Sequence, residues 1–218
     1  FRRVLFRSGG LAANYSISTG QTTTANITAK SLTVSGITAA NKIYDGGTTA
    51  TTTLSFSGLI GSETLGQTVG STFDNKNVGT GKTVTVNSIT LADGNNGGLA
   101  ANYSISPGQT TTANVTTKAL TVSGITASNK TYDATTSATL GTGSVNYGGL
   151  VSGDDFAGSY SGVFANANVG SGKTVTISSS YSGSDVSNYS VTNQSSTTAD
   201  ISAKALRSEE HTSELQSP

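Results

Sequence analysis

The chain of 218 residues carries 12 basic and 12 acidic side chains, so its formal net charge is zero, and this balance gives no sign of nucleic-acid or anionic-membrane binding. It contains no cysteine, which excludes disulfides and thiolate metal sites. Charged residues make up only 11% of it, whereas disordered chains usually have high net charge, and no run of about 18 apolar residues predicts a membrane span.

The first feature along the chain is a pair of related ends. The stretch "RSEEHTSE" begins at Arg207 and holds the only histidine, His211. One DNA sequence that encodes it, AGATCGGAAGAGCACACGTCTGAA, has a reverse complement that encodes "FRRVLFRS", which is residues 1–8. Selection on folding does not explain this relation, and the DNA resembles a standard short-read sequencing adapter. We therefore expect residues 1–8 and 207–218 to be cloning or assembly scars, with eight Lys and nine Asp plus Glu between them.

Between these ends the sequence repeats itself. The segment "ANITAKSLTVSGITAANKIYD" at 25–45 returns as "ANVTTKALTVSGITASNKTYD" at 113–133, 88 positions further on. This period exceeds a solenoid rung of about 20–50 residues and fits a small domain with its own core. The predicted units are the C-terminal strands of a preceding repeat at 9–30, two full repeats at 31–118 and 119–204, and the start of another at 205–206.

Within each predicted repeat, apolar and polar residues alternate over short runs, as in half-buried strands. The alternating pairs of the first repeat are Leu32 and Val34, Leu54 and Phe56, Val84 and Val86, Ile89 and Leu91, Tyr103 and Ile105, and Ala113 and Val115. Clusters of Gly, Asn and Asp predict the turns. About seven strands in about 100 residues favour an all-β chain of tandem immunoglobulin-like β-sandwiches, with another small β-sandwich or a β-grasp-like repeat as the alternative.

The junction between the two repeats has no linker rich in Gly, Pro or Ser. The last predicted strand of the first repeat, "TTANVTTK" at 111–118, continues directly into "ALTVSGIT" at 119–126. We therefore expect a short, stiff junction, and neighbouring repeats of the same chain as partners.

A motif near the start of each repeat resembles a known bacterial repeat. It reads "KIYDGGTTA" at 42–50 and "KTYDATTSA" at 130–138, and is followed by "NVGTGKTVTV" from Asn77 and "NVGSGKTVTI" from Asn168. These segments resemble the YDG-type repeat of very large haemagglutinin-like surface exoproteins of bacteria, which are secreted by the two-partner route. The resemblance implies an extracellular or cell-surface, adhesin-associated β-domain, and it offers no catalytic residues to carry over.

The recurring residues of this motif are predicted to be structural. They are Tyr44, Asp45 and Gly46 in the first repeat, and Tyr132, Asp133 and Ala134 in the second. Because alanine would be costly at a position that needs a positive φ, we expect instead a tight turn in which the aspartate accepts hydrogen bonds from the following residues. Each tyrosine is expected to pack at the rim of the core.

Further aromatic residues recur with the repeats. Tyr15, Tyr103 and Tyr189 lie in three "NYS" segments, and by analogy with the tyrosine corner of other sandwiches their hydroxyls are expected to bond nearby backbone. Phe73 and Phe164 precede the "NVG" segments and belong to the same motif.

Some segments invite a catalytic or binding interpretation but lack part of the pattern that it needs. The "GTGKT" segment lacks the first glycine of a phosphate-binding loop and leads into a predicted strand instead of a helix, so Lys82 and Lys173 are expected to be solvated. Asp154 and Asp155 lack the further spaced oxygen ligands of a calcium site. Glu63 is the only glutamate between the scars, and no paired carboxylates suggest glycoside hydrolysis. We therefore expect no catalytic residue, cofactor or metal site.

Repetition without reactive side chains favours a mechanical function. The repeats are predicted to extend and present functional domains that lie elsewhere in a bacterial adhesin. The alternative hypothesis is a binding module, in which the repeats themselves contact host-surface glycans or proteins through exposed Tyr and Thr, with Tyr44 and Tyr132 as the tyrosines whose change would abolish binding.

Overall fold

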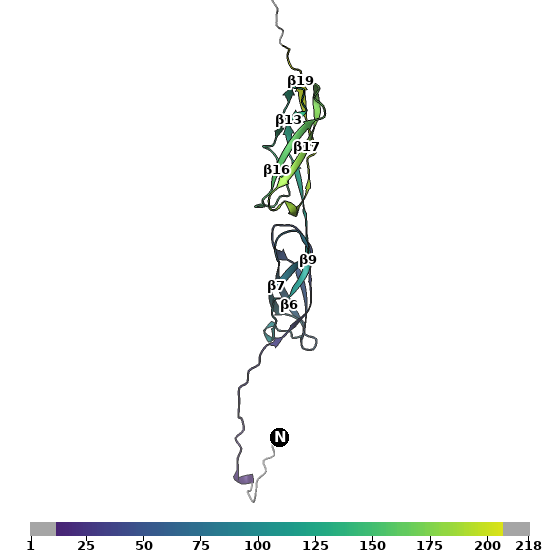
Figure 1. Ribbon diagram of the computed structural model, residues 1–218. Helices are drawn as coiled ribbons and strands as arrows, with labels where there is room; N and C mark the ends of the chain where they lie inside the picture. The colour runs from purple at the N-terminus through teal and green to yellow at the C-terminus, as the bar shows by residue number, and fades with distance from the viewer. Residues whose placement is uncertain (1–11, 207–218) are drawn as a thin grey trace, which may run out of the picture.

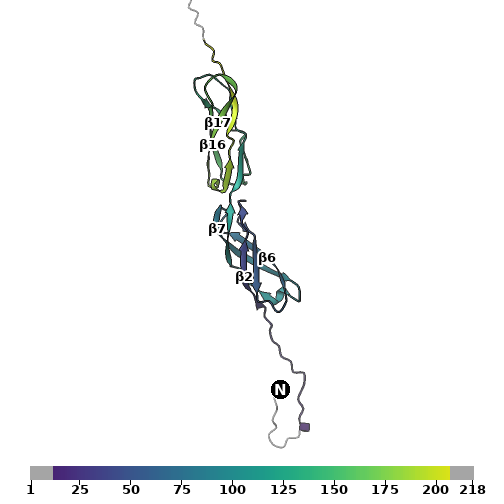
Figure 2. The ribbon, with the colours of Figure 1, turned by 90° about the vertical axis from the view of Figure 1, so that its right-hand side faces the viewer.

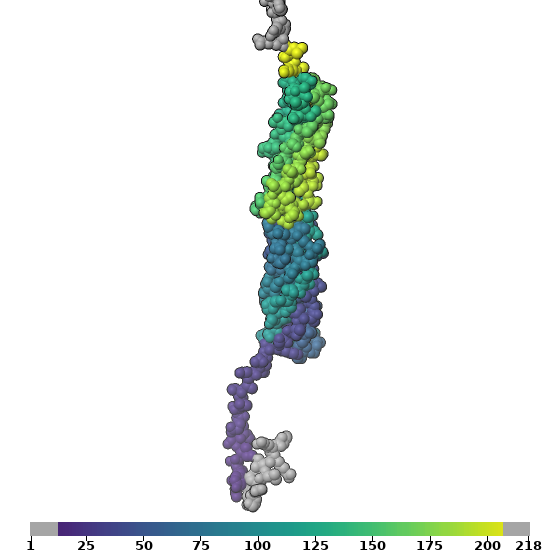
Figure 3. Space-filling view, in the orientation of Figure 1, coloured from purple at the N-terminus to yellow at the C-terminus, as the bar shows by residue number. Residues whose placement is uncertain are grey.

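The computed structural model describes residues 12–206, so the two scars predicted at the ends lie outside the described residues. Figures 1 and 2 show two elongated β-domains placed end to end, and Figure 3 shows that their surfaces meet. The expectation of an all-β chain built of β-sandwich repeats is confirmed. Among the described residues, no helix is long and apolar enough to cross a membrane.

The first repeat contains nine strands rich in Thr and Val, residue types that favour strands. They are β1 (Lys30–Ser31), β2 (Thr33–Ala39), β3 (Lys42–Ile43), β4 (Thr49–Ala50), β5 (Thr52–Ser57), β6 (Leu65–Phe73), β7 (Gly79–Asp93), β8 (Tyr103–Ser104) and β9 (Thr110–Thr116), with a 3-10 turn, η2 (Ala100–Asn102), before β8. One five-stranded sheet has the order β3-β9-β7-β6-β4, and the remaining strands form the pairs β2-β5 and β1-β8.

The second repeat has the same plan. Its strands are β10 (Lys118–Ser123), β11 (Thr126–Ala127), β12 (Lys130–Thr131), β13 (Ser137–Ala138), β14 (Leu140–Gly141), β15 (Asn146–Gly148), β16 (Ala157–Phe164), β17 (Gly170–Ser182), β18 (Tyr189–Thr192) and β19 (Ser196–Ser202), with η3 (Val186–Asn188) before β18. The five-stranded sheet has the order β12-β19-β17-β16-β13, and the others are β15-β10-β18 and β11-β14.

Both repeats contain parallel strand pairs, which the immunoglobulin arrangement of two antiparallel sheets does not predict. In the second repeat β10 pairs in parallel with β18, and β12 pairs in parallel with β19. The first repeat has the same pairs, β1 with β8 and β3 with β9. Parallel partners need a long connection, and here most of each repeat lies between the two strands. The first and last parts of every repeat are therefore tied together.

The core lies between the sheets and is made by the alternating positions. Leu32, Leu54 and Val84, which belong to the alternating apolar pairs that the sequence predicts, are buried. In each pair a single polar residue separates the two apolar positions. The buried cluster of the first repeat continues into that of the second, since Tyr44 and Tyr189 belong to one hydrophobic cluster. The two domains therefore share apolar contacts at their junction.

Residues 15–29 contain no strand, although the sequence predicts the last strands of a preceding repeat at 9–30. Their counterparts β8 and β9 pair with β1, β3 and β7, strands that belong to earlier parts of the same repeat. The described residues before β1 offer no such partners, so the segment extends away from the first repeat (Figure 1).

A tight turn follows β3, and we call it the YD turn (residues 44–47). Asp45 Oδ1 accepts hydrogen bonds from the Gly47 N–H at 2.9 Å and from the Lys42 ammonium at 2.7 Å. Lys42 also donates to the carbonyl of Gly47 at 2.7 Å and lies 5.5 Å from the centre of the Phe73 ring. The lysine three positions before the aspartate therefore ties the turn to the core.

The YD turn of the second repeat (residues 132–135) has the same contacts but one unfavourable residue. Lys130 bonds Asp133 at 2.8 Å and lies 5.5 Å from the centre of the Phe164 ring. Gly46 has a φ of 79° and Ala134 a φ of 64°. The turn thus needs the left-handed conformation as well as the aspartate, and the second repeat places alanine in it.

We predict that Ala134→Gly stabilises the second repeat. A left-handed conformation costs a residue with a Cβ roughly 1–2 kcal/mol, which glycine does not incur, so the free energy of unfolding should rise by about 1 kcal/mol after allowing for the greater backbone entropy of glycine. Chemical denaturation measures this change. Ala167→Gly, at a loop position outside the left-handed region, is the control and should give no gain; equal effects of the two variants would contradict the explanation.

Candidate functional site

The repeats meet through a junction with one intervening residue. Strand β9 ends at Thr116 and β10 begins at Lys118, which leaves Thr117 between the two domains. The end of the first repeat that carries the YD turn faces the second repeat, and we call this the far end of a repeat. The opposite end of the second repeat, which carries the turns before β16 and β18, faces the first repeat, and we call this the near end. Figure 1 shows that no loose segment separates them.

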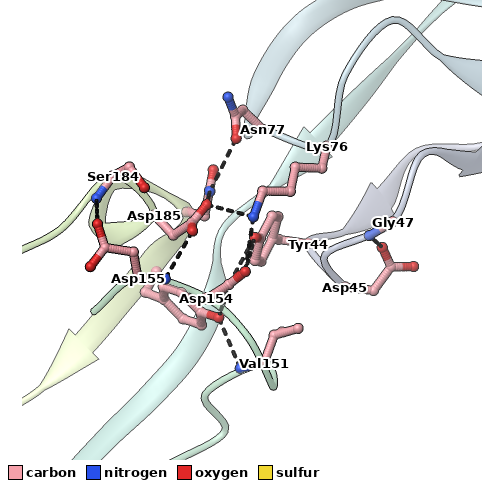
Figure 4. A network of polar contacts seen from close by, with 12 residues as sticks. Tyr44, Asp45, Gly47, Lys76, Asn77, Val151, Asp154, Asp155, Ser184 and Asp185 are labelled. Carbon is pink, nitrogen blue, oxygen red and sulfur yellow. Dashed lines mark hydrogen bonds and ion pairs between the residues drawn. The ribbon is translucent and has the colours of Figure 1, made fainter. Parts of the chain in front are cut away.

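The buried carboxylate of Asp154 lies at the centre of this inter-repeat joint. Its side chain is only 4% exposed. The Tyr44 hydroxyl from the far end donates to both of its oxygens, at 2.9 and 2.8 Å. The Lys76 ammonium lies 2.9 Å from Oδ1, and the Tyr189 hydroxyl donates to Oδ2 at 2.5 Å. Figure 4 shows Tyr44 and Lys76 converging on this carboxylate from the first repeat.

A second carboxylate holds the same lysine from the side. Lys76 lies 2.7 Å from Asp185 Oδ1, while Asp185 Oδ2 accepts a bond from the Asp155 N–H at 3.0 Å. Lys76 also lies 5.9 Å from the centre of the Tyr44 ring. The ammonium of the first repeat is therefore held between two acids of the second repeat and an aromatic face.

An amide contact extends the joint beyond the ion pairs. Asn188, which is fully buried, accepts a bond from the Val78 N–H at 3.0 Å and donates to Asn77 Oδ1 at 3.3 Å. It also donates to Asp185 Oδ1 at 3.3 Å. A loop of the first repeat is thus bound through its backbone as well as through Lys76, which fixes its position against the second repeat.

Apolar contacts surround these polar groups. The Tyr44 and Tyr189 rings meet edge to face with centroids 5.5 Å apart, an arrangement worth about 0.5–1.5 kcal/mol beyond the area that it buries. Val78 and Val151 pack against the shared cluster. A Cβ at Gly46 would lie only 2.8 Å from Val151 Cγ1, so glycine at this position allows the close approach.

A second lysine, Lys82, holds the loop that carries Lys76 in place. Lys82 pairs with Asp74 at 2.8 Å and donates to Asn75 Oδ1 at 2.7 Å, and the same oxygen accepts a bond from the Asn77 N–H at 3.0 Å. The side chain of Lys82 is 9% exposed. The expectation that the lysine of "GTGKT" is solvated is therefore wrong for Lys82, because the loop folds over it.

Opposing effects set the ionisation of the two acids. Burial raises the pKa of Asp154, but the bonds from Tyr189, Lys76 and Tyr44 outweigh it and hold the pKa below its usual value of 3.8. The pKa of Asp185 is also lowered, chiefly by Lys76. The pKa of Lys76 is raised, first by Asp185 and then by Asp154. All three groups are therefore charged near neutral pH.

The Asp154 carboxylate also raises the pKa values of the two tyrosines that bond to it. Burial and the bond to Asp154 raise the pKa of Tyr189 to about 12. Burial and the same carboxylate raise the pKa of Tyr44 above its usual value of 10.0. Both hydroxyls thus stay protonated and continue to donate across the joint. This arrangement suits docking of two domains, since every charge is already paired within the network.

Some of the residues that the sequence predicts to be structural lie in the joint. Tyr44, Gly46 and Tyr189 lie in it, whereas Asp45 remains in its own turn. Tyr189 accepts a bond from the Val151 N–H at 2.9 Å, so its hydroxyl bonds backbone as well as the carboxylate.

The other predicted residues lie elsewhere. Tyr132 and Asp133 occupy the far end of the second repeat, and Tyr103 occupies the near end of the first. Phe73 and Phe164 are buried beneath the two lysines of the YD turns. Tyr15 lies exposed in the segment before β1.

Sequence reasoning missed the residues that join the repeats. The sequence presents Asp154 and Asp155 only as an incomplete calcium site, and it predicts no role for Lys76, Asp185 and Asn188. One available signal is the contrast between copies, because Lys76 and Asp185 correspond to Ala167 and Leu99 in the other repeat. Within residues 12–206, no three His, Cys, Asp or Glu side chains are grouped so that they could hold a metal ion.

We predict that Tyr44→Phe weakens the joint. The change removes a hydrogen bond to a buried carboxylate, which is worth about 1.5–3 kcal/mol, so the free energy of unfolding should fall by a similar amount. The matched control is Tyr132→Phe, which alters the corresponding tyrosine at the uncovered far end and should cost less than about 0.5 kcal/mol. Equal losses in the two variants, measured by denaturation, would show that the joint is not what Tyr44 stabilises.

We also predict an acid-sensitive joint. Since the pKa values of Asp154 and Asp185 are lower in the folded protein than in the unfolded chain, the unfolded chain binds more protons at low pH. Their stabilisation is therefore complete well above pH 3.8 and is lost as the pH falls through the folded pKa values. Unfolding measured between neutral and acidic pH should show this loss.

The variant Lys76→Met provides the comparison for this experiment. Asp45, Asp74 and Asp133 also have lowered pKa values and remain in both proteins, so they supply a common acid-dependent loss. The variant should lose less stability on acidification than the parent chain, because Lys76 no longer favours the charged acids. An unchanged difference between neutral and acidic pH would refute the role given to Lys76.

The comparisons with known proteins agree with this two-domain arrangement. The YDG domain family matches the chain twice, at residues 28–113 and 116–199. No curated protein and no solved structure matches it. Each matched segment contains one YD turn, and the two segments together cover most of the sequence. The chain therefore belongs to the YDG domain family, and it contains two such domains in tandem.

Proposed function

We propose that these YDG domains are structural spacers that extend and present other domains of a bacterial secreted or cell-surface adhesin. The observation that carries this proposal is the joint itself, in which a one-residue connection is combined with side-chain contacts on the buried Asp154. A connection of this kind sets both the distance and the direction between consecutive domains. A protein that must hold a distant domain away from a surface needs both.

Three features of the joint oppose bending. Strand β9 leads into β10 after a single residue, so little chain is free to reorient. The ion pairs of Lys76 lie on the loop between β6 and β7, away from that connection in the sequence. The bond from the Val78 N–H to Asn188 adds a further point of attachment. Points of attachment on different loops restrain rotation as well as bending.

The proposed location is extracellular or on the bacterial surface, and the proposed role is mechanical, not enzymatic. The resemblance of the repeats to those of haemagglutinin-like exoproteins supports the location. The use of the acids supports the role, because Asp154, Asp185 and Asp45 are each occupied by a lysine of the chain. A chain without cysteine also needs no disulfide to fold after secretion.

Binding of a host glycan through both YD tyrosines is less well supported. Tyr44 is only 1% exposed, whereas Tyr132 is 39% exposed. The ring of Tyr44 can therefore contact a partner only if the joint opens, and the repeats do not present equivalent tyrosines. This difference favours the spacer over the binding module.

We predict that the chain scatters X-rays as a rod in solution. The distance distribution should match two domains placed end to end, as in Figure 1, and the variant Tyr44→Phe/Lys76→Ala should give a broader distribution because its joint can bend. Circular dichroism would verify that both domains of the variant remain folded. A compact parent chain, or identical profiles for the parent and the variant, would overturn the spacer proposal.

A further inference from the structure

The two outer ends of the pair repeat the two halves of the joint. The far end of the second repeat carries Tyr132, Ala134, Ala167, Asn168 and Val169 at the positions of Tyr44, Gly46, Lys76, Asn77 and Val78. The near end of the first repeat carries Ile60, Glu63, Leu99, Asn102 and Tyr103 at the positions of Val151, Asp154, Asp185, Asn188 and Tyr189. Each outer end therefore corresponds to one half of the joint. Ala134 stands opposite Ile60 where Gly46 stands opposite Val151, so the Ile60 side chain must turn away from the alanine Cβ for the ends to approach as closely.

The near end of the first repeat is already formed without a partner. The Ile60 N–H donates to the Tyr103 hydroxyl at 3.1 Å, as the Val151 N–H donates to Tyr189 at 2.9 Å. The Tyr103 hydroxyl in turn donates to the Glu63 carboxylate. The acid at the centre of this end is thus oriented in the same way as Asp154.

The far end of the second repeat is formed as well. Its YD turn has the bond between Lys130 and Asp133, and the Asn168 N–H donates to Asn166 Oδ1 at 3.1 Å, the counterpart of the bond from Asn77 to Asn75. Docking would therefore require little ordering of either end, which lowers its entropic cost.

Both outer ends expose apolar side chains at joint positions. Tyr132 is 39% and Val169 54% exposed at the far end, and Ile60 is 54% and Leu99 50% exposed at the near end. Three of these four replace residues that the joint covers, namely Tyr44, Val78 and Val151. The fourth, Leu99, replaces the charged Asp185. Exposed apolar groups gathered at a defined place mark interaction surfaces.

Two charged residues of the joint are replaced by uncharged residues on the outer ends, one on each end. The lysine of the joint is replaced by Ala167 on one end, and its partner Asp185 is replaced by Leu99 on the other. A far end with alanine would leave both Asp154 and Asp185 covered without their lysine, and an unpaired charge is costly to bury. Leu99 removes one of the two acids and leaves only Glu63, so the far end with alanine fits the outer near end better than it fits the near end of the existing joint.

We propose that the far end of the second repeat docks onto the near end of the first repeat of a second copy of this chain, and that positions 76/167 and 185/99 select which ends pair. A near end with aspartate requires lysine, which directs the far end with alanine to the near end with leucine. The inference rests on the proposed function, because the rod would lengthen through the same kind of joint. Glu63 takes the place of Asp154 and accepts the Tyr132 hydroxyl across the new contact.

Disulfide trapping can test this pairing, because it accumulates a contact that forms only briefly between free chains. In the existing joint, a Cβ at Gly46 would lie 3.9 Å from Val151 Cβ, which is within the span of about 3.5–4.5 Å that a disulfide requires. The counterparts are Ala134 and Ile60. The chain contains no other cysteine, so single substitutions report only on this contact.

The experiment mixes the single variants Ala134→Cys and Ile60→Cys in equal amounts in a glutathione redox buffer. Unbiased pairing makes half of the disulfide dimers mixed. Docking should raise the ratio of mixed dimers to like dimers on the order of tenfold above this chance value, which corresponds to about 1.4 kcal/mol. A mixed fraction at the chance value would overturn the proposal. Replacing Ala134→Cys by Ser161→Cys, at an exposed site on β16, is the control and should give the chance value.

A second set of variants tests whether positions 167 and 99 select which ends pair. Adding Leu99→Asp to the Ile60→Cys chain should remove most of the excess of mixed dimer, because it adds a second acid without a lysine, and adding Ala167→Lys to the Ala134→Cys chain should restore it. If Leu99→Asp has no effect, or if Ala167→Lys does not restore pairing, the rule is wrong even if docking occurs.

Two further measurements keep the outcomes distinct. If a cysteine variant has a lowered melting temperature, the pair Asn168→Cys and Asn102→Cys, taken from the contact between Asn77 and Asn188, replaces it, with a short bis-maleimide cross-linker in place of the disulfide because only the side-chain ends of this pair meet. Scattering of the monomer tests the spacer proposal separately. A rigid monomeric rod with chance pairing would refute only the docking of outer ends, whereas a bending monomer would refute the spacer.

Discussion

The joint depends on the buried carboxylate of Asp154, because groups from both repeats converge on it. Tyr44 and Lys76 approach it from one domain, and Tyr189 from the other. A buried carboxylate without partners would be strongly unfavourable, so the second repeat has its near end satisfied in full only when the first repeat is in place. This requirement links the stability of one domain to the position of its neighbour. The aromatic contact and the amide of Asn188 then fix the rotation between them.

The same constraint gives the YD motif two roles. Its aspartate closes a turn under a lysine that lies over a buried phenylalanine, and both repeats share this part. Its tyrosine faces outwards from the turn, where it is either covered, as Tyr44 is, or left at the surface, as Tyr132 is. The turn is therefore local structure, while the tyrosine belongs to the contact between domains.

The sequence predicted the class of fold well, because half-buried strands produce an alternation of apolar and polar residues with a period of two. The alternation through Leu32, Leu54 and Val84 identified the inward faces, and the period of the repeat separated the domains. It did not predict the parallel pairs or the joint, since both depend on segments distant along the chain. Tyr44 and Asp154, for example, are 110 residues apart, and neither has a local pattern that points to the other. The left-handed turn at Ala134 was also missed, because alanine there argues against the conformation that the chain adopts.

The unlike ends of each repeat have a consequence for how such a chain can change in length. With the docking proposed above, every domain carries one half of a joint at each end, so duplicating or deleting a whole domain in the gene leaves a complementary pair at the new boundary, provided that the residues at the Lys76 and Asp185 positions still match. Rods of different reach could thus arise by recombination between repeats, with no new interface to evolve. The direction of the chain would be preserved at every step, because a far end meets only a near end.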